Sequence, residues 1–301
     1  MNIFISGATG FLGKHILKKI SKENYNILAT SRKEHKDTYV QKNVDWVFGN
    51  LNDLDFLKTK LIEFNPDITI HLAWNGIPDY SEATSKNNLD NSISLFNLII
   101  SNTNCKKILV SGSCWEYGKT HGVCKENDLV NINSYFNWAK YSLYRYLSIK
   151  CAENNIDYNW FRIFYVYGMG QRDSALIPTL IESINKNKRP LIHNPLNKND
   201  FIFIDDVVKV FSKAIKKSLP SGVYNLGSGS SSSVYDISLI VEQELLSSKR
   251  ISSKILENGS NDEAINFWAD METTLNKLNI SELTSLNSGI TKLIRTTFQG
   301  N

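Results

Sequence analysis

Residues 134–140 read SYFNWAK, and their spacing is that of a proton-transfer pair from which the hydroxyl is missing. Lys140 follows the aromatic residue Phe136 by four positions on a predicted helix, so both side chains lie on one helix face. A tyrosine at position 136 would complete the pair, but phenylalanine carries no acidic group. Tyr135, the nearest tyrosine, is five positions from the lysine. Taken alone, Lys140 would be an exposed lysine on an amphipathic helix.

A second candidate site is the glycine-rich stretch SGATGFLG, which places Gly7, Gly10 and Gly13 where a predicted strand meets a predicted helix. Small residues let the backbone turn tightly and approach a pyrophosphate, and the helix N-terminus offers free N–H groups. The same pattern also forms tight turns that bind nothing. Its position at the first strand–helix junction favours a dinucleotide site.

The end of the second predicted strand bears on which dinucleotide would bind. An acidic residue there would bind the ribose hydroxyls of NAD, but the sequence has Ser31, Arg32 and Lys33. A serine hydroxyl and an arginine guanidinium can both bind a 2′-phosphate, and the guanidinium can also stack on adenine. A solvated basic loop is the alternative. We interpret this stretch as indicating NADP.

These residues are positioned by a predicted alternation of strands and helices, which indicates a parallel sheet covered on both faces. Strands are predicted at 2–6, 26–31, 44–51, 67–74, 107–113 and 158–168, and helices at 11–22, 53–64, 87–101 and 134–153. Later elements are a helix at 176–188, a strand running into a helix at 200–217, a strand at 222–229 and a helix from about Ser233. The tail from about Arg250 reads as irregular.

We therefore expect an α/β fold, with a Rossmann-type doubly wound parallel sheet of six or seven strands and a smaller C-terminal substrate-binding lobe. The expected dinucleotide-binding domain is 1–165, with 200–225 returning to it. The expected substrate lobe comprises 166–199 and 226–301.

Composition excludes several classes of function. The 301 residues carry a net charge of +4 without a polybasic block, which argues against nucleic-acid binding by bulk electrostatics. The four cysteines form no metal-binding spacing, so no metal site is expected, and reduced thiols are the favoured state. No signal peptide or membrane-length apolar run is visible, and we expect a cytoplasmic protein with no membrane partner.

Five further motifs follow the glycine turn along the chain. They are HLA (71–73), SGSCWEYG (111–118), FRIFYVYG (161–168), DFIFIDDV (200–207) and VYNLGSG (223–229). Together and in this order, they resemble the extended short-chain dehydrogenase/reductase superfamily, specifically its NAD(P)-dependent nucleotide-sugar epimerase, dehydratase and reductase group. The resemblance extends to about residue 240.

The resemblance implies a set of residues around NADP. They are Gly7, Gly10, Phe11, Leu12, Gly13, Ser31, Arg32, Asn50, Leu51, Leu72, Ala73, Trp74, Asn88, Ser111, Lys140, Tyr165 and Val166. Asn50 stands where the family usually has aspartate. Asn91 is a less favoured alternative to Asn88 for the cofactor contact.

The resemblance also implies catalytic roles for Ser113, Phe136 and Lys140. Ser113 matches the hydroxyl residue that binds the substrate 4-oxygen, and Lys140 matches the lysine that lowers the tyrosine pKa and holds the nicotinamide ribose. Phe136 stands at the tyrosine position. In the 4,6-dehydratases of the group, the hydroxyl residue is followed by Asp-Glu. This chain has Cys114 and Trp115 at those two positions, so dehydration is not expected.

Residues expected to contact the substrate come from both parts of the chain. They are Ser113, Cys114, Trp115, Phe136, Phe164, Tyr165, Arg172, Leu176 and Ile177. Tyr165 replaces the usual asparagine, and Asn199 replaces the usual arginine that reaches the diphosphate. Arg172, Lys198 or Arg189 would then supply the positive charge. Leu176 and Ile177 read equally as the start of a packed helix.

The leading hypothesis is an NADPH-dependent reductase of a nucleotide-diphosphate-linked 4-keto-6-deoxy sugar (dTDP-, CDP- or GDP-linked), acting in bacterial surface-polysaccharide (O-antigen, lipopolysaccharide) synthesis. A site suited to NADP suggests a cofactor that is released each turnover, unlike the bound NAD of the epimerases. A nucleotide-sugar epimerase and a catalytically silent NADP-binding sensor or scaffold are the alternatives. Phe136 is interpreted as an engineered substitution or as a natural variant with another acid. The predicted helices at 87–101 and 134–153 are candidates for a homodimer contact by family resemblance.

Overall fold

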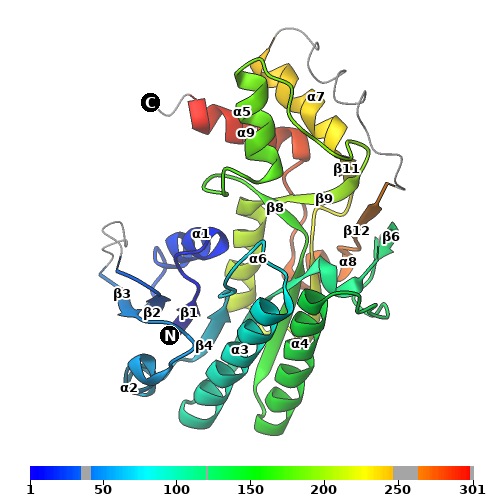
Figure 1. Cartoon of the computed structure of the whole chain (residues 1–301). Helices are drawn as coiled ribbons and strands as arrows, with labels where there is room; N and C mark the ends of the chain where they lie inside the picture. The colour runs from blue at the N-terminus through cyan, green and yellow to red at the C-terminus, as the bar shows by residue number, and fades with distance from the viewer. Residues whose placement is uncertain (35–41, 120, 247–263, 299–301) are drawn as a thin grey trace. The chain divides into compact units, whose positions relative to one another are not determined.

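The computed structural model describes residues 1–34, 42–119, 121–246 and 264–298, which fall into two compact units. The first unit comprises 1–118, 128–163 and 208–224, and the second comprises 119–127, 164–207 and 225–301. Figure 1 labels their elements.

The first unit is built around a seven-stranded sheet with the strand order β10-β7-β5-β4-β1-β2-β3. Its strands are β1 (Asn2–Ser6), β2 (Asn26–Ser31), β3 (Val44–Phe48), β4 (Ile68–His71), β5 (Lys107–Ser113), β7 (Asp157–Ile163) and β10 (Gly222–Leu226). The pairs from β7 through β5, β4, β1 and β2 to β3 are parallel. The predicted doubly wound parallel sheet is confirmed.

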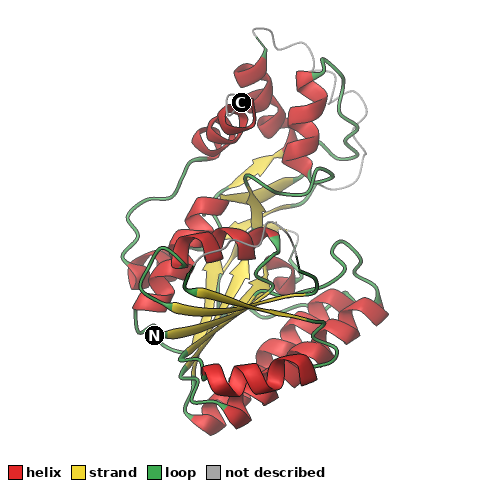
Figure 2. Cartoon of the chain, turned by 90° about the vertical axis from the view of Figure 1, so that its left-hand side faces the viewer, coloured by secondary structure: helices red, strands yellow, loops and turns green. Residues whose placement is uncertain are grey.

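Helices lie on both faces of this sheet (Figure 2). They are α1 (Phe11–Ile20), α2 (Asp55–Phe64), α3 (Glu82–Asn102), α4 (Tyr135–Asn154) and α6 (Ile204–Lys216), and a short 3₁₀ helix, η1 (Cys114–Tyr117), follows β5. A buried core joins α2, α3 and α4 to the sheet through side chains such as Leu61, Phe96, Leu143 and Trp160. This packing of apolar faces holds the strand ends, and so the candidate site, in place.

The second unit contains a smaller mixed sheet with the strand order β11-β9-β12-β6, and β8 also pairs with β9. Its strands are β6 (His121–Cys124), β8 (Tyr165–Tyr167), β9 (Lys198–Phe203), β11 (Ser231–Ser233) and β12 (Asn266–Ala269). Its helices are α5 (Leu176–Asn185), α7 (Val234–Leu245), α8 (Glu272–Leu278) and α9 (Leu286–Phe298), and α7 contacts both α5 and α9.

Three sequence expectations about elements were wrong. The single strand at 158–168 is two strands, because the chain leaves the large sheet after Ile163 and β8 pairs with β9 instead. The helix expected at 87–101 begins at Glu82, since Ser81 caps its N-terminus by accepting a hydrogen bond from the Thr84 amide. The tail is ordered over 264–298, where it forms β12, α8 and α9; residues 250–263 lie outside the described residues.

Candidate functional site

The glycine turn connects β1 to α1 and has no room for side chains at two positions. Gly7 has a φ of +74°, and a Cβ there would lie 2.6 Å from the Ala73 backbone nitrogen. A Cβ on Gly13 would lie 2.1 Å from the Gly7 carbonyl oxygen. Gly10, the N-cap residue of α1, provides no side-chain cap, so the N–H groups of the first turn can bind an anion.

A cavity of about 230 Å³ opens beside this turn, entirely within the first unit. It lies at the carboxyl ends of parallel strands, where doubly wound sheets bind their ligands. Ten of the predicted cofactor residues line it: Gly7, Gly10, Ser31, Arg32, Asn50, Leu51, Leu72, Ala73, Trp74 and Asn88. The remaining lining residues are Asn91, the less favoured alternative, and six that the sequence did not single out: Thr9, Thr30, Gly49, Asn75, Asn87 and Ser92.

The charge in this cavity comes from Arg32. Its Nη1 donates a 2.7 Å hydrogen bond to Oδ1 of Asn75, and the neighbouring Ser31 hydroxyl donates to the Lys33 carbonyl oxygen at 2.9 Å. None of the described residues that line the cavity is acidic. The cavity therefore presents a guanidinium, which binds phosphate oxygens, whereas the Ser31 proton is already donated to the Lys33 carbonyl oxygen.

Asn88 shapes the loop after β4. Its Oδ1 accepts a 2.7 Å hydrogen bond from the Asn75 amide, and its Nδ2 donates to the carbonyl oxygens of Asn75 and Thr84 at 2.9 and 2.8 Å. The side-chain amide is therefore used within the protein, where it fixes the position of Asn75, the partner of Arg32. Its predicted contact with the cofactor stays a prediction.

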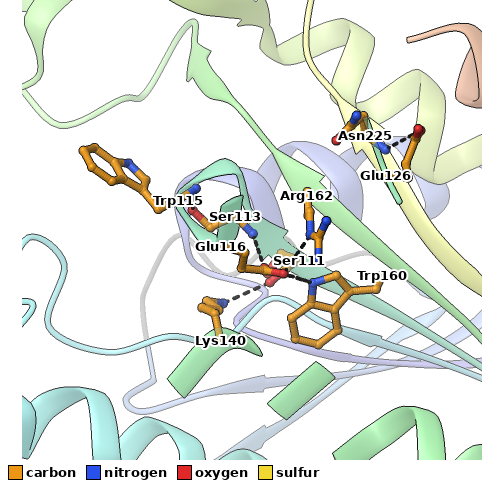
Figure 3. Close-up of polar contacts among 9 residues, drawn as sticks. All are labelled: Ser111, Ser113, Trp115, Glu116, Glu126, Lys140, Trp160, Arg162 and Asn225. Carbon is orange, nitrogen blue, oxygen red and sulfur yellow. Dashed lines mark hydrogen bonds and ion pairs between the residues drawn. The ribbon is translucent and has the colours of Figure 1, made fainter. Parts of the chain in front are cut away.

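Ser113 ends β5, and its backbone and hydroxyl are both fixed (Figure 3). Its N–H donates to Oε1 of Glu116 at 2.7 Å, and its Oγ accepts a hydrogen bond from the Trp115 amide at 3.2 Å. The Ser113 O–H has no acceptor among the residues that the structure describes. This hydroxyl is therefore arranged to donate to an added oxygen.

Glu116 is the centre of a buried polar cluster that holds this end of β5 (Figure 3). The Glu116 carboxylate is fully buried and accepts from Trp160 Nε1 at 2.9 and 3.0 Å and from Arg162 Nε at 3.0 Å. Gly112 makes this approach possible, because a Cβ there would lie 2.2 Å from Trp160 Nε1. A buried carboxylate is tolerated only with such donors.

This cluster was not predicted from the sequence, although the sequence contains a signal for it. Arg162 lies in the otherwise largely apolar stretch FRIFYVYG, and Glu116 lies in a motif that ends with an aromatic residue and glycine. A charge in a buried strand requires a partner of opposite charge. Pairing the two charges from sequence alone would have required knowing that β5 and β7 are neighbours.

Lys140 is buried, with 5% of its surface exposed, and is not the surface lysine that α4 alone would suggest. Its Nζ donates to the Ser111 carbonyl oxygen at 3.0 Å and lies 3.9 Å from the centroid of the Trp74 ring. Burial lowers the pKa of Lys140 to about 8, an effect that the nearby Glu116 carboxylate partly opposes. The positive charge therefore lies beside the end of β5.

Phe136 is also buried, with 7% of its surface exposed. Its ring packs edge-on against Trp74, at a centroid distance of 5.6 Å, and against Tyr80, at 5.0 Å. Tyr135, the preceding residue, is 52% exposed. The residue at the tyrosine position thus makes packing contacts alone.

The other predicted residues of the first unit lie around these groups. Phe11 and Leu12 are in the first turn of α1, and Ser111 is buried in β5. Cys114 is buried in η1, whereas the neighbouring Trp115 is 47% exposed. Dehydratase-type carboxylates are therefore absent from both positions after Ser113.

The second unit carries the remaining predicted substrate residues. Phe164 is buried against Phe267, with ring centroids 6.0 Å apart, and Tyr165 packs against the same ring at 6.3 Å. Val166 follows in β8. Arg172 is exposed, and α5 begins at Leu176 with Ile177 buried.

The described residues carry neither a metal cluster nor a membrane span. No group of three or more His, Cys, Asp or Glu side chains in the described ranges is arranged to hold a metal ion. No described helix is both long and apolar enough to cross a membrane.

Comparison with known proteins gives a consistent picture. The sequence model of the NAD dependent epimerase/dehydratase family matches residues 3–227. CDP-abequose synthase of Salmonella muenchen is 23% identical over 296 residues, covering 97% of this chain and 96% of that protein. The dTDP-4-dehydro-6-deoxyglucose reductase of Escherichia coli is 24% identical, with 97% and 96% covered. The UDP-glucose 4-epimerase of Thermotoga maritima, solved with UDP-glucose, has the same fold, with a TM-score of 0.87, 20% identity and 100% and 99% covered.

Proposed function

Because the chain belongs to the NAD dependent epimerase/dehydratase family, we propose that it uses NADPH to reduce the 4-keto group of a nucleotide-linked 4-keto-6-deoxy sugar. The observation that carries the proposal is the cavity at the glycine turn, where Ser31 and Arg32 are among the lining residues and no described lining residue is acidic. NAD-selective sites place a carboxylate at the ribose hydroxyls, whereas a guanidinium favours the 2′-phosphate of NADP.

The relatives support the substrate class. One full-length relative is named as a reductase of a dTDP-linked 4-dehydro sugar, and another as a synthase of a CDP-linked sugar. By this proposal the reduced nucleotide sugar serves bacterial surface-polysaccharide synthesis. The second unit, with Phe164, Tyr165, Arg172, Leu176 and Ile177, is proposed to bind the substrate, and α3 and α4 are proposed to form a homodimer contact.

The residues of the first unit fit this reaction. The glycine turn and the open N-terminus of α1 would hold the pyrophosphate, and Arg32 the 2′-phosphate. Ser113 would donate its O–H to the sugar 4-oxygen, where negative charge develops as the carbonyl is reduced. The Lys140 ammonium would stabilise that charge and bind the nicotinamide ribose. When bound, NADPH would supply the hydride. Because Phe136 has no hydroxyl, water would supply the proton that completes the new 4-hydroxyl group.

The test compares the chain with a Phe136→Tyr variant. Both are mixed with NADPH and a panel of nucleotide-linked keto sugars, and absorbance at 340 nm is followed. We expect the variant to react about 10²-fold to 10⁴-fold faster, the usual contribution of a positioned general acid. Binding of NADPH without oxidation in either form would overturn the proposal.

Phe136 supports a second candidate function. A site that binds NADP without a proton donor at this position fits a silent sensor or scaffold. This candidate predicts tight NADP binding and no turnover in either the unmodified chain or the Phe136→Tyr variant, so the same experiment separates the two functions.

A further inference from the structure

Trp74 forms a wall between two groups of candidate residues. On one side it lines the cavity that contains the glycine turn and Arg32. On the other side its indole ring contacts the Lys140 ammonium, 3.9 Å from the ring centroid, and the Phe136 ring. Lys140, Ser113 and Phe136 are not among the residues that line the cavity. The cavity therefore ends at the indole ring.

The size of the cavity agrees with this division. At about 230 Å³ it is smaller than the roughly 300–1,000 Å³ of pockets that enclose a whole drug-sized ligand, and a dinucleotide is a large ligand. Arg32 and the residues that follow the strand ends line this cavity. Lys140, the residue expected to bind the nicotinamide ribose, is covered by the Trp74 ring.

The indole also has an unused hydrogen-bond donor. Trp74 Nε1 is buried and has no hydrogen-bond partner among the described residues. A buried N–H without an acceptor is unfavourable, so the indole N–H lacks a favourable hydrogen bond in the observed position of the ring. Because Nε1 is buried, the ring has to move before this N–H can donate to an acceptor.

We propose that Trp74 controls which part of the cofactor the site admits. With the indole over Lys140, the cavity takes an adenosine nucleotide bearing phosphates, and the nicotinamide ribose reaches Lys140 only after the ring moves. This inference rests on the proposed binding of NADP. Because only the molecules with the ring displaced accept the whole dinucleotide, the cost of moving the ring weakens the apparent affinity for NADP⁺.

The test measures binding by isothermal titration calorimetry and needs no catalytic activity. Adenosine 2′,5′-bisphosphate and NADP⁺ are titrated into the unmodified chain and into a Trp74→Ala variant. We expect the unmodified chain to bind both ligands with dissociation constants within about threefold. In the variant, NADP⁺ should bind at least about tenfold more tightly than the bisphosphate. Trp138→Ala, which removes a partly exposed indole from α4, is the matched control and should behave like the unmodified chain.

Two results would overturn the inference, and they differ in meaning. If the unmodified chain prefers NADP⁺ by the same factor as Trp74→Ala, the indole is no obstacle, and the proposed function stands without it. If the unmodified chain binds neither ligand, the proposed cofactor is wrong and this inference fails with it. If Trp74→Ala does not fold, Trp74→Leu replaces it. A preference of the unmodified chain for NADP⁺ of about tenfold or more would by itself overturn the inference.

Discussion

Ser113 has a hydroxyl whose oxygen accepts from the Trp115 amide and whose proton is directed to no described group. In the proposed reaction it therefore donates to the sugar 4-oxygen. Phe136 supplies packing and no proton, so by this proposal the serine and a tyrosine at position 136 would act on the same oxygen. The two contributions can be separated by mutation.

In a Phe136→Tyr background, Ser113→Ala should lower kcat by about 10²-fold to 10³-fold, the usual effect of removing one donor to a developing oxyanion. The dissociation constant of NADPH should stay unchanged, because the proposal gives Ser113 a contact with the sugar 4-oxygen and none with the cofactor. Single-turnover oxidation of NADPH measures the first quantity, and calorimetry the second. Equal rates with and without the Ser113 hydroxyl would show that the serine is only structural.

Arg32 should determine the choice of cofactor. Arg32→Asp replaces the guanidinium at the cavity with a carboxylate, which repels a 2′-phosphate and accepts ribose hydroxyls. We expect the ratio of NADPH to NADH affinity to fall by at least about tenfold in titrations of both cofactors. Lys33→Asp, which changes charge equally at a neighbouring residue outside the lining, is the control. An unchanged ratio in Arg32→Asp would remove Arg32 from the cofactor site.

Burial of Lys140 should make the free energy of unfolding depend on pH. Its folded pKa of about 8 is below its ordinary 10.5, so between these values the unfolded chain binds the proton that the folded chain has lost. Stability from this group therefore rises with pH across that window, by about 3 kcal/mol in full. Urea unfolding of the unmodified chain and of Lys140→Met at pH 7.5 and pH 10.5 tests this. From the lower to the higher pH, the free energy of unfolding of the unmodified chain should rise by about 3 kcal/mol relative to that of the variant. Parallel profiles would contradict a buried ammonium.

At the scale of elements, the end of β5 is held by charges from β7 and η1. The large sheet and the glycine turn could be predicted from sequence, because strand alternation and glycine spacing are local patterns. The division of 158–168 into β7 and β8 could not, since both halves are apolar and only pairing with β9 separates them. The Glu116–Arg162 pair was missed for the same reason: its partners meet only when β5 and β7 lie side by side.

Removing one partner of the Glu116–Arg162 pair should lower the free energy of unfolding more than replacing both partners with apolar residues. Glu116→Val alone leaves the Arg162 charge buried without its carboxylate, and we expect the free energy of unfolding to fall by about 3–5 kcal/mol. Glu116→Val with Arg162→Leu should recover most of that loss, because neither charge of the pair remains buried without its partner. Urea unfolding of both variants tests this. A loss below about 1 kcal/mol in the single variant would show that the pair is not buried in solution.

At the scale of the whole molecule, the reactivity of the buried cysteine thiols measures cooperative opening of the folded chain. All four are buried, and burial raises the pKa of Cys151 to about 12 and raises that of Cys105. Thiolate is the reactive form, so these two thiols should react with a disulfide reagent only when the chain opens. Labelling followed by mass spectrometry should show Cys105 and Cys151 unmodified in buffer and modified in urea. Rapid labelling in buffer would contradict the packed core.

The central claim, reduction of a nucleotide-linked 4-keto sugar, is tested most directly by tracing the hydride. The Phe136→Tyr form is given NADPH carrying deuterium at both C4 positions, together with a 4-keto-6-deoxy sugar nucleotide. We expect a reduced sugar that carries deuterium at C4, formed in step with NADP⁺. An isomerised sugar without deuterium, or an unchanged sugar beside bound cofactor, would contradict the account.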